Sequence, residues 1–106
     1  MVGFKHASSY STSKGALIQF TRTLAIEWAR FGINVNAIAL GWFSTELNAA
    51  AMSNEDFKAT LLKKIPLGRL GQIREIGPLS IYLASPASDF MTGSVIVMDG
   101  GELANW

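Results

Sequence analysis

Residues 9–40 combine a long apolar helix with a strand that follows it directly. Between residues 9 and 30, apolar side chains recur at steps of three and four, which predicts a helix. They are Leu17, Phe20, Leu24, Trp28 and Phe31, with Ile18, Ala25 and Ala29 beside them. Ser8 or Ser9 can cap the start, and Gly32 can end the helix in a left-handed conformation. Because the apolar positions cover more than one face, we expect this helix to be buried on two sides.

Two segments have the composition of strands. Residues 33–40 are apolar enough for a buried parallel strand, and Asn34 and Asn36 are expected to lie within it. Residues 93–98 predict a second strand, which ends at the turn Asp99-Gly100-Gly101. We do not expect this turn to hold a phosphate, because no helix is predicted to follow it.

Two shorter helices are predicted between these strands. Ser53-Asn54-Glu55-Asp56 resembles a capping box, with aspartate in place of the usual glutamate, so a helix should run from there to about Lys64. Capping and the helix dipole explain Glu55 and Asp56 better than acid–base chemistry does. Another helix is expected over residues 73–84, and Pro78 should bend it because proline removes one intrahelical hydrogen bond.

This order of helices and strands favours an α/β fold in which a helical crossover joins two parallel strands. Two such strands cannot cover two apolar faces, so we expect the last part of a doubly wound sheet, with about two strands and three or more helices. The composition is 49% hydrophobic and only 16% charged, against about 25% charged in an average globular chain. We therefore expect apolar faces that meet another subunit or another part of the same domain.

Charge, cysteine and histidine content argue against several classes of function. The formal net charge of +1, without any block of lysine or arginine, argues against nucleic-acid binding. The chain has no cysteine and one histidine, so no metal site is expected, and His6 should lie near the surface. Without a leader segment or a run of about 20 apolar residues, no membrane association is expected, and a cytoplasmic location is predicted.

Tyr10 and Lys14 are the candidates for chemistry. They stand four residues apart at the start of the first predicted helix, which places their Cβ atoms about 5–6 Å apart on one face. A nearby lysine cation lowers the pKa of a tyrosine, and the positive end of the helix dipole acts in the same direction. Such a phenol can exchange a proton with a carbonyl or an alcohol near neutral pH. This spacing is common in helices, so the pair alone does not establish catalysis.

The sequence around this pair resembles the short-chain dehydrogenase/reductase family. Residues 10–17 resemble its Tyr-x-x-x-Lys active-site helix, residues 25–28 resemble the end of that helix, and residues 32–38 resemble the following strand. Residues 41–45, Gly-Trp-Phe-Ser-Thr, are similar to the family's Pro-Gly-x-x-x-Thr segment over the nicotinamide. Residues 65–69 and 92–101 resemble the exit of its substrate loop and its final strand. The resemblance implies that residues 1–106 are a C-terminal fragment of one Rossmann-like domain whose N-terminal cofactor-binding half is absent.

The resemblance also implies a set of roles. Tyr10 would be the catalytic acid/base, and Lys14 would lower its pKa and bind the nicotinamide ribose. The other contacts implied for the cofactor, NAD or NADP, come from Gly41, Trp42, Phe43 and Thr45. Leu40 departs from the family pattern, which has proline before the glycine, so the exit of the strand is expected to be less constrained.

Other parts of the family pattern are not found in these 106 residues. They contain no Thr-Gly-x-x-x-Gly-x-Gly cofactor loop, and Ser8, Ser9 and Ser13 are too close to Tyr10 to be the catalytic serine. We therefore expect the isolated chain to bind cofactor poorly. The segment between Thr45 and Leu67 would decide substrate specificity. Its run of small and apolar residues at 48–52, together with the family resemblance, leans toward sugar-acid or 3-oxoacyl substrates.

Two functions remain open. The first is a NAD(P)-dependent oxidoreductase that interconverts a carbonyl and an alcohol on a small-molecule substrate and forms a homo-oligomer. The alternative is a catalytically inactive truncated module that associates with partners through its apolar helix and strands. Trp42 and Phe43 follow a strand at the edge where open α/β sheets bind ligands. They are equally compatible with a substrate pocket and with an ordinary core.

Overall fold

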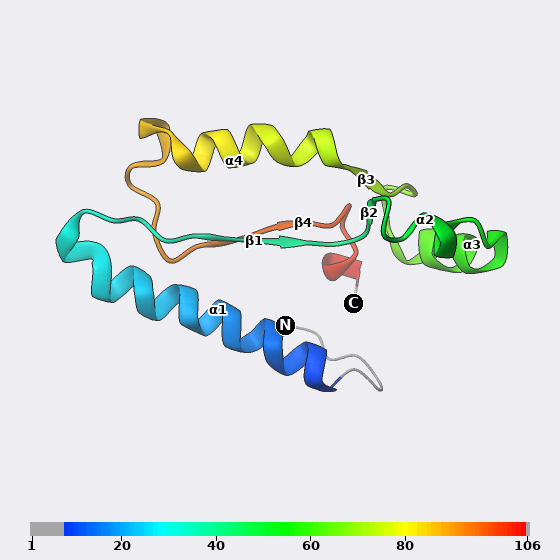
Figure 1. Ribbon diagram of the computed structural model, residues 1–106, viewed down its shortest axis with the longest axis horizontal. Coiled ribbons are helices and arrows are strands. Elements are labelled where there is room, and N and C mark those ends of the chain that lie inside the picture. Colours follow the sequence, from blue (N-terminus) through cyan, green and yellow to red (C-terminus); the bar gives the residue numbers. More distant parts are fainter. Residues whose placement is uncertain (1–7, 106) are drawn as a thin grey trace. The chain divides into compact units, whose positions relative to one another are not determined.

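The computed structural model describes the backbone of residues 8–105 and the side chains of residues 14–104 (Figure 1). The chain divides into two compact units. The first consists of residues 1–38 and 83–96, and the second consists of residues 39–82 and 97–106. The α/β fold class is confirmed, because helices alternate with parallel strands along the chain.

The first unit begins with helix α1 (Ser8–Trp28), which continues as the 3₁₀ turn η1 (Ala29–Phe31). Gly32 then adopts a φ of 72°, and its N–H donates to the carbonyl of Ala29, which confirms the predicted left-handed end. The suggested caps, Ser8 and Ser9, have side chains outside the described residues.

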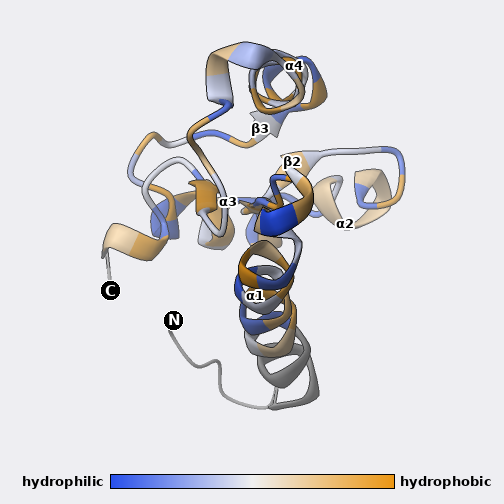
Figure 2. Ribbon diagram, turned by 90° about the vertical axis from the view of Figure 1, so that its left-hand side faces the viewer, coloured by the Kyte–Doolittle hydropathy of each residue, from blue (hydrophilic) through white to orange (hydrophobic). Residues whose placement is uncertain are grey.

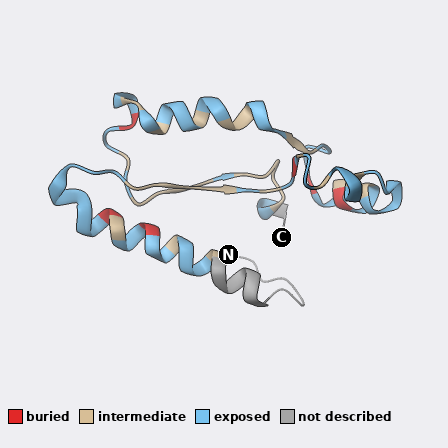
Figure 3. Ribbon diagram, viewed as in Figure 1, coloured by how far each residue is buried: buried red, intermediate tan, exposed pale blue. Residues whose placement is uncertain are grey.

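The face of α1 that turns inward differs from the prediction. Thr21 and Ala25 are buried, whereas Leu17 is 54% and Phe20 is 60% exposed (Figure 3). The predicted burial on two sides is therefore wrong for this chain by itself. The physical reason is that the small side chains of α1 can pack closely against the backbone at Gly93. A Cβ added to Gly93 would lie only 3.4 Å from the Cβ of Ala25. The larger apolar stripe remains accessible.

Strands β1 (Ala37–Leu40) and β4 (Val95–Met98) pair with each other. The N–H of Ala37 donates to the carbonyl of Ser94, and the N–H of Gly41 donates to that of Met98. Both bonds join residues at the same separation in sequence, so the strands run parallel, as predicted.

Strand β1 is shorter than the predicted segment, and placing Asn34 and Asn36 within it was wrong. The Asn34 amide donates to the carbonyl of Asp89. The Asn36 amide donates to the carbonyl of Met91 and accepts from the N–H of Ser94. These side-chain bonds interrupt the strand ladder over residues 34–36 because asparagine competes well for backbone partners, although the carbonyl of Val35 still accepts from the N–H of Gly93.

A second pair of strands in the second unit was not predicted. Strand β2 (Phe43–Ser44) pairs in parallel with β3 (Gly71–Gln72), with Phe43 opposite Gly71. Strands of two residues carry no periodic signal in the sequence.

The helices of the second unit begin and end differently from the prediction. A short helix, α2 (Ala49–Met52), precedes α3 (Glu55–Lys64). The N-cap of α3 is Asn54, whose side chain accepts from the N–H of Phe57. The predicted capping box starting at Ser53 is therefore wrong by one residue. The reason is that Ser53 already ends α2, where its hydroxyl donates to the carbonyl of Ala50.

The helix predicted over residues 73–84 is divided. It starts as the 3₁₀ turn η2 (Ile73–Glu75) and continues as α4 (Ile76–Ala84). Pro78 cannot donate to the carbonyl of Arg74, which lies in the 3₁₀ part, so we attribute the change of geometry to this proline. Much of α4 is hydrophobic (Figure 2), and Ile81 is 70% exposed.

Few side chains among the described residues are buried. The buried hydrophobic ones are Ala25 in the first unit and Phe43, Leu61 and Ile65 in the second. Two further 3₁₀ turns, η3 (Pro86–Ser88) and η4 (Leu103–Asn105), complete the chain. Ser88 is buried, and its hydroxyl donates to the carbonyl of Leu83. Most of the buried hydrophobic side chains among the described residues thus belong to the second unit.

Candidate active site

The predicted proton-transfer pair lies on α1 in the first unit. The backbones of Tyr10 and Lys14 both belong to this helix, four residues apart. Lys14 is half-buried, on the same face as the buried Thr21. The side chain of Tyr10 lies outside the described residues, as does His6. The helical spacing on which the prediction depends is therefore present in α1.

Gly41 stands at the carboxyl end of β1, where the backbone leaves the strand. A Cβ built on it would lie 2.6 Å from the Cβ of Asp99, which follows β4. Its N–H donates to Met98 at 2.9 Å. The close approach of two backbones explains why glycine is needed at this position. The main chain at the exit of the strand is thus held by packing and a ladder bond, although Leu40 replaces the family's proline.

Trp42 and Phe43 take different positions next to this exit. Phe43 is buried, and its ring occupies the space that a side chain at position 71 would fill, with its Cε2 2.5 Å from a Cβ built on Gly71. Trp42 is 40% exposed, and its ring meets Phe57 of α3 edge-on, with ring centroids 6.5 Å apart. Phe43 thus serves as core, whereas Trp42 remains accessible.

Thr45 and Asn48 form a compact hydrogen-bond network. The N–H of Thr45 donates to Oδ1 of Asn48 at 3.0 Å, and the N–H of Asn48 donates to Oγ1 of Thr45 at 3.3 Å. The Asn48 amide also donates to the carbonyl of Phe43 at 2.7 Å. Sequence reasoning missed Asn48. A threonine and an asparagine three residues apart in a turn are the signal that could have identified it.

Trp42 and Phe43 also line a cleft of about 480 Å³ within the second unit. The other lining residues are Pro66, Leu67, Arg69, Gly71, Glu75, Val97, Met98, Asp99, Gly100 and Gly101. The cleft thus lies at the carboxyl ends of β1 and β4, which is where open α/β sheets bind ligands. Most of its lining is apolar, with three charged side chains.

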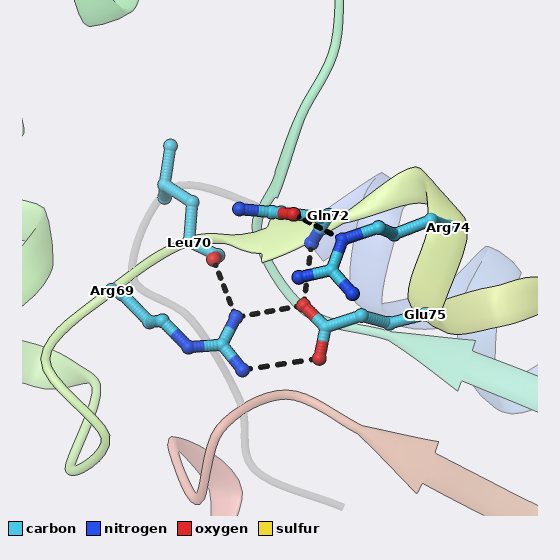
Figure 4. Close-up of polar contacts among 5 residues, drawn as sticks. All are labelled: Arg69, Leu70, Gln72, Arg74 and Glu75. Carbon is cyan, nitrogen blue, oxygen red and sulfur yellow. Dashed lines mark hydrogen bonds and ion pairs between the residues drawn. The ribbon is translucent and has the colours of Figure 1, made fainter.

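Two of these charged side chains neutralise each other (Figure 4). The guanidinium of Arg69 contacts the carboxylate of Glu75 through two bonds, of 2.7 and 3.0 Å. Glu75 also accepts from the N–H of Gln72 at 3.0 Å. The hydrogen bonds from Arg69 and Gln72 lower the pKa of Glu75 to about 2, and Glu75 in turn raises the pKa of Arg69. Both groups are therefore charged over the physiological range.

The third charged side chain, Asp99, forms the predicted turn. Its Oδ1 accepts from the N–H of Gly101 at 2.9 Å, and its Oδ2 accepts from the N–H of Leu103 at 2.8 Å. The expectation that no helix follows was wrong, since the 3₁₀ turn η4 starts at Leu103. The carboxylate itself occupies the N–H groups there, so the structural interpretation of this turn holds. Partial burial and Asp99 raise the pKa of the nearby Glu102.

The hydroxyl of Thr45 is a group that could bind part of a nicotinamide cofactor. Oγ1 of the half-buried Thr45 accepts from Asn48, so its proton is available to an acceptor such as a carboxamide or phosphate oxygen.

Among the residues that the structure describes, no three histidine, cysteine, aspartate or glutamate side chains gather to hold a metal ion. In the same residues, no helix is both long and apolar enough to cross a bilayer.

Comparisons with known proteins place this chain among dehydrogenases and reductases. Residues 1–102 match a family model described as enoyl-(acyl carrier protein) reductase. The chain is 44% identical over 95 residues to galactitol 2-dehydrogenase (L-tagatose-forming) of Cereibacter sphaeroides, covering 90% of this chain and 37% of that protein. It is 40% identical over 105 residues to a tropinone reductase homolog of Arabidopsis thaliana, covering 99% of this chain and 34% of that protein.

A solved structure of a dehydrogenase is also similar to this chain. The crystal structure of gluconate 5-dehydrogenase from Burkholderia cenocepacia, in complex with NADP and tartrate, superposes with a TM-score of 0.89. The sequence identity is 39%, and the match covers 97% of this chain and 40% of that one. This chain therefore spans well under half the length of the relatives that it matches.

Proposed function

We propose that this chain, which belongs to the short-chain dehydrogenase/reductase family, supplies the proton-transfer part of an oxidoreductase. The family uses NAD or NADP, and the reaction proposed here interconverts an alcohol and a carbonyl. The observation that supports the proposal is the spacing of Tyr10 and Lys14 on α1, within the residues that match the family. In the proposed reaction, Tyr10 donates a proton to the carbonyl oxygen or removes it from the alcohol.

The roles proposed for the other groups are those that the family resemblance implies. Lys14 stabilises the phenolate of Tyr10 and binds the nicotinamide ribose. Thr45 donates its hydroxyl proton to the cofactor, and the backbone at Gly41, Trp42 and Phe43 borders it. The cofactor supplies or accepts the hydride when it is bound.

These 106 residues contain no glycine-rich loop of the family's type, so other residues must bind the pyrophosphate. We therefore propose that residues 1–106 form the C-terminal part of one Rossmann-like domain.

The cleft in the second unit is the proposed substrate site. Its cation, Arg69, is already paired with Glu75, and the remaining charge of its lining is the carboxylate of Asp99. Such a cleft provides little attraction for a phosphate or a dicarboxylate. Relatives of this chain are named for galactitol and gluconate. We therefore propose a hydroxyl-rich substrate, and we favour a polyol over a sugar acid. Trp42 would provide an apolar contact for this substrate.

The experiment compares Tyr10→Phe with Tyr82→Phe in protein expressed from the complete reading frame. The chain has two tyrosines, so Tyr82, 41% exposed on α4, is the matched control. With a polyol and NAD or NADP, Tyr10→Phe should lower kcat by about 10²-fold or more, because a general acid–base group contributes about 10²–10⁴-fold. Tyr82→Phe should retain kcat. Unchanged turnover in Tyr10→Phe would refute the proposed role.

A second candidate function is association without catalysis. It is favoured by the exposed apolar side chains of α1, where Ile26 is 79% and Phe20 is 60% exposed. The same surface supports a homo-oligomer of the enzyme. The coding sequence before the codon for Met1 separates the alternatives. An in-frame glycine-rich loop, with a serine about a dozen codons before Tyr10, favours the enzyme. A start codon with its own ribosome-binding site favours the association module.

A further inference from the structure

Asn48 forms three hydrogen bonds that tie the backbone after β2 into one turn. Its Oδ1 accepts from the N–H of Thr45, its own N–H donates to Oγ1 of Thr45, and its Nδ2 donates to the carbonyl of Phe43. At 2.7 Å, the last of these is the shortest. Asn48 is half-buried, as is Thr45. The Asn48 amide thus joins Phe43, the first residue of β2, to Thr45.

This arrangement differs from that of an ordinary helix cap. Asn48 directly precedes α2, yet its side chain accepts no bond from the backbone of that helix. Asn54 precedes α3 and does cap it, through the N–H of Phe57. The Asn48 side chain instead turns back toward residues 43–45. Its contacts therefore serve the segment before it, and not the helix after it.

The hydrogen bonds between Asn48 and Thr45 also leave the hydroxyl of Thr45 able to act as a donor. Because Oγ1 of Thr45 accepts from the N–H of Asn48, its hydroxyl proton is left to be donated to another group. The backbone N–H of Asn48 holds the Thr45 oxygen, and the Asn48 side chain holds the Thr45 backbone N–H. The side chain thus fixes the backbone that carries the hydroxyl before a ligand arrives. Pre-orientation of a donor improves binding because less conformational freedom is lost.

We propose that Asn48 is a positioning residue for the nicotinamide cofactor, acting through the hydroxyl of Thr45. The inference rests on the proposed function, in which Thr45 donates to the cofactor. Asn48, three positions after Thr45, would then contribute to cofactor binding, and the segment between β2 and α2 would influence the affinity for the cofactor. The carbonyl of Phe43 is the fixed point from which the side chain of Asn48 holds the threonine.

The experiment measures the dissociation constants of NADP and NAD by fluorescence titration, without substrate, in protein from the complete reading frame. Thr45→Ala should weaken binding by up to about 10-fold, the worth of one hydrogen bond, and Thr45→Ser should retain affinity. Asn48→Ala should weaken binding by a similar factor. The double variant should bind no more weakly than Thr45→Ala, because both changes remove the same contact.

Two further variants separate positioning from stability. Asn54→Ala removes a cap in the same unit and should lower the thermal midpoint without changing the dissociation constant. Asn48→Asp keeps an acceptor for the N–H of Thr45 but cannot donate to the carbonyl of Phe43, so it should also weaken cofactor binding, by a factor no larger than that of Asn48→Ala. It serves as the test if the alanine variant does not fold, because a dissociation constant equal to that of wild type would overturn positioning by Asn48.

The outcomes distinguish this inference from the proposed function. If Thr45→Ala binds weakly and Asn48→Ala binds normally, positioning by Asn48 is wrong and the cofactor contact of Thr45 stands. Additive losses in the double variant, or an equal loss in Asn54→Ala, also overturn it. If Thr45→Ala binds normally, the cofactor contact proposed for Thr45 fails, and the inference fails with it.

Discussion

The guanidinium of Arg69 and the carboxylate of Glu75 form a bidentate pair at the edge of the cleft, with N–O distances of 2.7 and 3.0 Å. Arg69 also donates to the carbonyl of Leu70, and Glu75 accepts from the N–H of Gln72. The pair therefore joins the segment before β3 to the 3₁₀ turn after it. The contact between these two side chains, which are six residues apart in sequence, thus closes the loop formed by residues 69–75.

Glu75 makes the stability of the protein depend on pH. Its pKa in the folded protein is about 2, below its ordinary value of 4.5. Its stabilising contribution is therefore complete above about pH 4.5 and is lost as the pH falls toward 2. Glu75→Gln should lower the thermal midpoint at pH 7 by a few degrees, and this difference from wild type should shrink with acidification. Glu46→Gln, which changes an exposed carboxylate, is the control. A difference independent of pH would contradict the assignment.

Gly71 faces the ring of Phe43, so a side chain there should disturb the core of the second unit. A Cβ at this position would lie 2.5–2.8 Å from three ring atoms of Phe43. Gly71→Ala should destabilise the protein by about 1–3 kcal/mol, as overpacking does. Gly77→Ala is the matched control, because a Cβ there meets nothing within 4 Å. It should be neutral or stabilising by up to about 1 kcal/mol, since alanine favours helix. Equal effects of the two changes in urea denaturation would refute the packing argument.

Asn36 should matter more for stability than Asn34. The partly buried Asn36 side chain bonds to both Met91 and Ser94, whereas the exposed Asn34 bonds to Asp89. Asn36→Ala should cost about 1–3 kcal/mol because it leaves two backbone groups without these partners. Asn34→Ala should cost about 0.5–1 kcal/mol. Chemical denaturation of both variants tests the order, and a larger loss for Asn34→Ala would contradict it.

The apolar stripe of α1 should control self-association if the chain forms a homo-oligomer through this helix. Phe20→Ser should shift the protein to smaller species in sedimentation experiments, because it removes an apolar side chain that is 60% exposed. Phe90→Ser is the matched control, since Phe90 is fully exposed in this chain and lies outside α1. An unchanged distribution for Phe20→Ser would exclude α1 as the contact surface.

The bounds of α1, its end at Gly32 and the turn at Asp99 were readable from the sequence. In each case the cause lies within a few neighbouring residues, so a local pattern suffices. The same holds for the placement of Tyr10 and Lys14 on one helix. Their roles in catalysis, like the cofactor contact of Thr45, stay predictions.

Which face of α1 is buried depends on tertiary contacts. Thr21 and Ala25 are buried in place of the Leu17 and Phe20 stripe because packing depends on the shape of the opposing backbone, here near Gly93. Likewise, Phe43 reaches Gly71, and Trp42 reaches Phe57, across long separations in sequence. No periodic pattern specifies such pairs, since each depends on how distant segments meet. Patterns among neighbouring residues are enough to predict α1, its end at Gly32 and the family resemblance, whereas the β2–β3 pair and the cleft with its neutralised Arg69–Glu75 pair arise from tertiary contacts.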